Sequence, residues 1–174
     1  MKKNPLYTRP LMMQYLMFGL LAAVAYCVFL LMHLGRGDYE SSYLLYIGNT
    51  LFGAVILIYN LTLINKPYVK DRTVSMTMIG HLATLAGTII SVLMVVIAGL
   101  VIYPGATLDN APANTQGDRP AGWMMMVGMN AFLINFAVGS FLSIMTSYAG
   151  KKNQTKDKPA HLGTEVSNGP VTND

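Results

Sequence analysis

The sequence predicts an all-α fold: an integral membrane four-helix bundle with both termini in the cytoplasm and a disordered C-terminal tail. Hydrophobic residues make up 53% of the 174-residue chain and charged residues only 11%, less than half of the roughly 25% usual in soluble domains. The charged residues lie in five short polar segments. Between them are four runs without Asp, Glu, Lys or Arg, each long enough to cross about 30 Å of hydrocarbon as a helix.

The N-terminal segment, residues 1–10, is expected to be cytoplasmic, and the first span covers about residues 11–34. Its beginning resembles a secretory signal, because MKKNPLYTR precedes an apolar run that contains Ala23-Val24-Ala25. The apolar sequence continues through YCVFLLMHL, however, well beyond the roughly 7 to 15 residues of a signal core. We therefore expect this segment to be retained as a membrane span.

Three further spans are expected at about residues 43–65, 75–103 and 121–148, so that the transmembrane bundle occupies residues 11–150. Helices are expected because a lipid-exposed backbone must satisfy its own hydrogen bonds, and the strands of a barrel would give shorter, alternating segments. The segment 104–120 between the last two spans is rich in Pro, Gly, Asn and Asp, which is typical of a linker that contains turns.

The orientation follows from the distribution of basic residues, because Lys and Arg favour the cytoplasmic side of short membrane loops. Ten of the twelve lie in the N-terminal segment, the second loop and the tail: Lys2, Lys3, Arg9, Lys66, Lys70, Arg72, Lys151, Lys152, Lys156 and Lys158. The other two loops contain one each, Arg36 and Arg119. This asymmetry predicts that both termini are cytoplasmic and favours the inner membrane of a bacterium as the location.

The C-terminal segment, residues 151–174, has no aromatic residue and few apolar ones, so we expect a disordered cytoplasmic tail. Four of its lysines follow the last span closely enough to contact anionic lipid headgroups, at about 1 kcal/mol each: Lys151, Lys152, Lys156 and Lys158. Nucleic acid is not an expected partner, because the basic residues are divided among membrane-flanking segments and lack the interleaved aromatics of a stacking surface.

A polar stripe interrupts the third span. Its members are separated by four, three, four and three residues, which places them on one side of a helix: Thr77, His81, Thr84, Thr88 and Ser91. Asn60 in the second span and Asn135 in the fourth each belong to a similar series, in which polar and small residues recur every three or four positions. Asn60 and His81 are at similar depths from the cytoplasmic end, so we expect a hydrogen bond between antiparallel second and third helices.

Two hypotheses for His81 remain open. It can be an interhelical hydrogen-bonding residue worth about 0.6 to 2 kcal/mol, or part of an ion or proton path, as intramembrane ionisable residues often are. No Asp or Glu lies in any predicted span, which disfavours coupled transport.

Catalytic and cofactor sites have no signature in the sequence. The single cysteine, Cys27, cannot form an intramolecular disulfide. The histidines His33 and His81 are expected at opposite ends of the bundle, so they do not form a pair of haem ligands. Met124, Met125 and Met126 point in different directions around a helix and cannot jointly face a copper ion. We expect no metal, no cofactor and no enzymatic activity.

Two short segments, YIGNTLFG and IGHLATLAG, give residues 1–150 a weak likeness to known proteins. The chain resembles uncharacterised small bacterial membrane proteins with four spans, and this resemblance implies no activity. We expect a non-enzymatic structural or accessory subunit that associates with itself or with a larger membrane complex through its small-residue and polar helix faces. The alternative is a small permease or channel-like protein with a polar path around His81.

Overall fold

The computed structural model describes residues 9–37, 40–64, 72–102 and 122–157. In these residues all regular structure is helical, without strands. The long helices are α1 (Arg9–Arg36), α2 (Tyr43–Ile64), α3 (Arg72–Ile102) and α5 (Asn135–Asp157). Three shorter elements complete the described chain, namely a 3₁₀ turn η2 (Glu40–Ser42), the helix α4 (Trp123–Met129) and a π-helical turn η3 (Asn130–Ile134).

Four helical segments are long and apolar enough to cross a membrane: Pro10–Arg36, Glu40–Ile64, Thr73–Ile102 and Trp123–Gly150. The prediction of an all-α chain with four such helices is therefore confirmed. The fourth segment consists of α4, η3 and α5 joined end to end. A π turn inserts an extra residue into a helix and often marks a functional position. This turn was not expected from the sequence.

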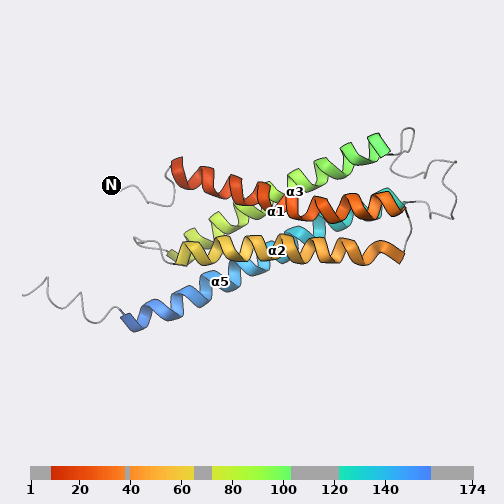
Figure 1. Cartoon of the computed structure of the whole chain (residues 1–174). Coiled ribbons are helices and arrows are strands. Elements are labelled where there is room, and N and C mark those ends of the chain that lie inside the picture. The colour runs from red at the N-terminus through yellow and green to blue at the C-terminus, as the bar shows by residue number, and fades with distance from the viewer. Residues whose placement is uncertain (1–8, 38–39, 65–71, 103–121, 158–174) are drawn as a thin grey trace, which may run out of the picture.

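The four long segments pack in a closed ring whose order differs from their order in the chain. Helix α1 packs against α2 and α3, and α5 packs against the same two helices, whereas α2 and α3 touch only locally across the centre. The beginning of α1 and the end of α5 lie at the same end of the bundle, as Figure 1 shows. The α1–α2 and α3–α5 pairs are consequently antiparallel, and the α1–α3 and α2–α5 pairs are parallel.

Glycine allows α1 and α3 to approach most closely near their midpoints. A Cβ atom on Gly19 would lie 2.7 Å from the Ala83 carbonyl oxygen, and a Cβ atom on Gly87 would lie 2.8 Å from the Gly19 carbonyl oxygen. Both distances are too short for a real side chain, so backbone packs directly on backbone, as in small-residue contacts between membrane helices. The small-residue faces expected to bind partners are thus buried inside the chain's own bundle.

Helices α1 and α5 extend beyond the ends of the predicted spans. Helix α1 ends at Arg36. The next residue, Gly37, has a φ of 66°, which suits glycine, and its amide donates a hydrogen bond to the His33 carbonyl oxygen at 3.1 Å, an arrangement typical of helix C-termini. Helix α5 continues to Asp157, so residues 151–157 of the expected disordered tail are helical.

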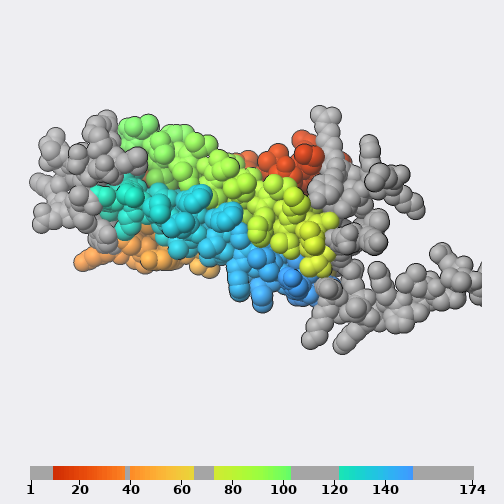
Figure 2. All heavy atoms as spheres, turned by 180° about the vertical axis from the view of Figure 1, so that it is seen from behind, coloured from red at the N-terminus to blue at the C-terminus, as the bar shows by residue number. Residues whose placement is uncertain are grey.

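The outer surface of the bundle is apolar. Exposed large hydrophobic side chains occur on every long helix, for example Met17 on α1, Tyr46 on α2, Val101 on α3 and Phe141 on α5. Figure 2 shows the face on which α3 and the α4–α5 segment lie side by side. Such a surface is unusual for a soluble monomer and is what four helices surrounded by lipid require.

Candidate functional site

The interior of the bundle contains a column of buried polar side chains. Residues that are at most 3% exposed include Asn49, Asn60, Thr84, Thr88, Ser91, Asn135, Ser143 and Ser147. They come from α2, α3 and α5 and, together with Tyr26 of α1 and Asn130 of η3, contribute to three polar groups along the bundle. In lipid, polar side chains between helices either hold the helices together or mark a path for a polar solute.

The first group lies where α2, α3 and α5 meet. The side-chain amide of Asn60 donates hydrogen bonds to Ser143 Oγ at 3.1 Å and to the Ile56 carbonyl oxygen at 2.9 Å. Gly80 of α3 faces this pair, because a Cβ atom at position 80 would collide with Asn60 Oδ1 and would lie 2.5 Å from Ser143 Oγ. A three-helix contact therefore depends on the missing side chain of Gly80.

The prediction of a hydrogen bond between Asn60 and His81 is wrong. Asn60 bonds to α5 instead, and Nδ1 of His81 is buried without a hydrogen-bond partner. The His81 ring lies edge-on to Phe136, with ring centroids 6.5 Å apart. The physical reason is the packing order: α3 packs mainly against α1 and α5 rather than against α2, so the residue next to Asn60 on α3 is Gly80 and His81 is turned toward α5.

Two threonines of the predicted stripe bond within their own helix. Thr77 Oγ1 donates to the Thr73 carbonyl oxygen and Thr84 Oγ1 to the Gly80 carbonyl oxygen, each at 2.9 Å. Thr77 is only partly buried, whereas Thr84 is fully buried against Gly139 of α5. The donor protons of these hydroxyls are satisfied within the helix, so the two side chains can only accept a further hydrogen bond.

The second group lies about two helical turns from the first and contains the remaining predicted residues. Gly80 faces Ser143 and Thr84 faces Gly139. The residue numbers therefore increase along α3 in the direction in which they decrease along α5, as expected for antiparallel helices. One more turn of each antiparallel helix places Thr88 opposite Asn135, with Ser91 on the same side of α3. All three side chains are 0% exposed. Thr88 Oγ1, Ser91 Oγ and both amide atoms of Asn135 lack hydrogen-bond partners in the structure.

The third group links α1, α2 and the start of the π turn, and it was not expected from the sequence. The side-chain oxygen Oδ1 of Asn130 accepts hydrogen bonds from Tyr26 Oη at 3.2 Å and from Asn49 Nδ2 at 3.1 Å. Asn130 follows Met129 in an apolar run. A lone polar residue in such a run is the only sequence feature that could have indicated this site. The π turn begins at this residue, so the hydrogen bonds anchor the irregular part of the fourth span.

His33 closes the end of the bundle beyond this group. Its Nδ1 lies 2.7 Å from Ser41 Oγ, and its ring is tilted against the Trp123 ring with centroids 5.4 Å apart. His33 and Ser41 are buried, so this cluster joins α1, η2 and α4. The expectation that His33 and His81 lie too far apart to form a pair of ligands agrees with these different surroundings.

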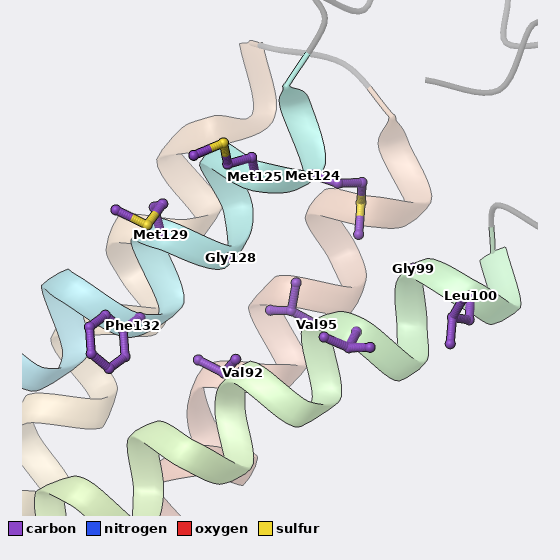
Figure 3. A pocket seen from close by; sticks show the side chains of 10 residues that line it. Val92, Val95, Gly99, Leu100, Met124, Met125, Gly128, Met129 and Phe132 are labelled. Atoms are coloured by element: carbon purple, nitrogen blue, oxygen red, sulfur yellow. The ribbon is translucent and has the colours of Figure 1, made fainter. Parts of the chain in front are cut away.

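A lateral groove lies between α3 and α4, on the side of the second group away from Gly80. It encloses about 550 Å³, and its walls are apolar, as Figure 3 shows for Val92, Val95, Met125, Met129 and Phe132. A second groove of about 470 Å³ lies between α2 and α5. Within the described residues, no group of three or more His, Cys, Asp or Glu side chains is arranged to hold a metal ion.

Comparisons with protein families, with curated proteins and with solved structures find no match. Any functional conclusion therefore depends on the geometry of this chain. The loop 104–120 and Lys158 lie outside the described residues, as do the side chains of Lys151, Lys152 and Lys156.

Proposed function

We propose that the chain is a non-enzymatic integral membrane protein of the bacterial inner membrane, a structural or accessory subunit with both termini in the cytoplasm. The observation that carries this proposal is the distribution of side chains: four long helices expose apolar residues outward and bury Asn, Ser and Thr between them. This arrangement suits lipid as the surrounding solvent. The anionic headgroups next to Lys151, Lys152, Lys156 and Lys158 contribute to the membrane affinity.

A structural role is supported by how the bundle is closed. The glycine contacts between α1 and α3, and the Asn60–Ser143 bond beside Gly80, join helices of one chain. Association with a second copy or with a larger complex therefore uses the outer apolar surface rather than the small-residue faces. This differs from the surface that the sequence indicated for such contacts.

The experiment is to express the full chain and extract its membranes with alkaline carbonate, followed by size determination in a mild detergent. We expect the protein to resist carbonate extraction and to elute as a complex larger than the monomer. Release into the supernatant would refute membrane integration. A monomeric mass in detergent and in native gels of solubilised membranes would refute the structural or accessory role and leave integration intact.

A small permease is a second candidate, and the column of buried polar groups favours it. Three groups on different helices place polar atoms at successive levels: Asn60 and Ser143, then Thr88, Ser91 and Asn135, then Asn130, Asn49 and Tyr26. Proteoliposome swelling with water and small neutral solutes tests this function. A rate equal to that of protein-free vesicles for every solute would exclude it.

A further inference from the structure

The groove between α3 and α4 has the size of a small-molecule site. Its volume of about 550 Å³ lies within the roughly 300 to 1,000 Å³ of ligand pockets. Gly128 contributes to this space, because a Cβ atom on it would meet no heavy atom within 4 Å. Gly99 lines the opposite wall and is covered by the end of the Met124 side chain, because a Cβ atom at position 99 would collide with Met124 Cε; Figure 3 shows both glycines on facing helices.

The inner end of the groove lies next to the second polar group. On α3, the groove residue Val92 follows Ser91 directly and lies about one turn from Thr88. On the facing segment, the groove residue Phe132 belongs to the π turn that ends just before Asn135. An elongated ligand in the groove would therefore end within about one helical turn of four polar atoms that lack partners.

The two hydroxyls of this group, like Ser140 Oγ on α5, differ from five other hydroxyls of α3 and α5. Thr77, Thr84, Ser143, Thr146 and Ser147 each donate a hydrogen bond to a carbonyl oxygen of their own helix. A helix always offers this partner, so a buried hydroxyl that does not use it leaves its hydrogen-bonding capacity open at a cost. Thr88 and Ser91 leave their hydroxyls without a hydrogen-bond partner, and they lie opposite Asn135, whose amide is also unpartnered and fully buried.

We propose that this groove binds a neutral lipophilic molecule with a hydroxyl or carbonyl group, whose polar group bonds to Asn135, Thr88 and Ser91. The apolar walls select a hydrocarbon body. The described groove residues include no charged side chain, so nothing there balances a charged head group, and the ligand is neutral. Thr88, Ser91 and Asn135 are fully buried and are not part of the groove lining, so the polar group reaches them only when Val92 and the exposed Phe132 side chain move aside. The inference rests on the proposed membrane location, because the ligand enters from the bilayer.

The test uses two photoactivatable probes in proteoliposomes that contain the full-length protein. One is a long-chain alcohol with a diazirine group, and the other is the matching hydrocarbon without the hydroxyl. We expect the alcohol to label α3 and α4 peptides next to the groove several-fold more strongly than the hydrocarbon does. Asn135→Leu should abolish this preference without reducing labelling by the hydrocarbon.

Further variants separate the groove from its polar end. Gly128→Leu fills the groove and should reduce labelling by both probes, whereas Leu93→Phe adds bulk to an exposed position outside the groove lining and should reduce neither. Thr88→Val keeps the shape of the side chain and removes only the hydroxyl. It therefore provides the same test as Asn135→Leu if that variant does not fold.

Equal labelling by the two probes, unchanged by Asn135→Leu and Thr88→Val, would overturn the inference and identify the groove as ordinary lipid-facing surface. Labelling confined to peptides away from the groove would overturn it as well. Carbonate extraction of the same vesicles distinguishes this failure from that of the proposed function. A chain that resists extraction but shows no probe preference refutes only the ligand site, whereas a chain that is released refutes both.

Discussion

Substitution of Gly80 by alanine tests the three-helix contact that closes the bundle. A Cβ atom at this position would collide with Asn60 Oδ1 and lie 2.5 Å from Ser143 Oγ. The hydrogen bond between these two residues would then have to break or lengthen. Because backbone and side chains from three helices meet here, the added methyl group has no free space to occupy.

The expected cost follows from three contributions. Loss of an interhelical hydrogen bond costs about 0.6 to 2 kcal/mol, and forcing an extra carbon into a packed site costs about 1 to 3 kcal/mol. Alanine returns about 1 kcal/mol through its higher helix propensity than glycine. The net destabilisation of Gly80→Ala is therefore about 2 kcal/mol, within a range of about 0.6 to 4.

The assay is unfolding in mixed micelles with increasing SDS, followed by the fluorescence of the single tryptophan, Trp123, which is buried. Gly128→Ala is the matched control, because a Cβ atom there meets nothing within 4 Å and only the gain in propensity remains. Gly80→Ala should unfold at a clearly lower SDS fraction than the wild type, and Gly128→Ala at the same or a higher one. Equal midpoints for Gly80→Ala and the wild type would refute the contact.

Two other substitutions are expected to differ in the same assay, one with little effect on stability and one with a large loss. His81→Leu should cost less than about 0.5 kcal/mol, because it removes a buried nitrogen without a partner; a loss above 1 kcal/mol would reveal a hydrogen bond that the structure lacks. Asn130→Leu should cost about 2 kcal/mol or more, because it removes the acceptor of both Tyr26 and Asn49 and leaves their donors buried; a stability equal to that of the wild type would contradict the anchoring role of Asn130.

The number of long apolar helices could be predicted because the signal is local. An uncharged run of sufficient length gives a membrane helix whatever the neighbouring helices are. The π turn at Asn130–Ile134 could not be predicted in this way. Its sequence is as apolar as an uninterrupted helix, and the bonds from Tyr26 and Asn49 that anchor it come from other helices.

The partner of Asn60 illustrates why the site was harder to predict than the fold. Depth along the helices placed Asn60 correctly near the level of His81, but depth does not specify which helices are neighbours. Chain order suggested that α2 is the main neighbour of α3, whereas α3 packs mainly against α1 and α5 and presents Gly80 rather than His81 to Asn60. The fully buried positions Thr84, Thr88, Ser91 and Asn135 were identified from spacing alone, because a polar stripe must face the interior of a bundle in lipid.

The most direct test of the account is the membrane topology of the full chain. Single cysteines are introduced at Asn114 or Ser167 in a Cys27→Ala background, and intact cells are treated with a membrane-impermeant maleimide. With four spans and cytoplasmic termini, Asn114→Cys should react in intact cells, and Ser167→Cys only after the membrane is permeabilised. Reaction of Ser167→Cys in intact cells, or equal reaction at both positions, would contradict the proposed threading of the chain through the membrane.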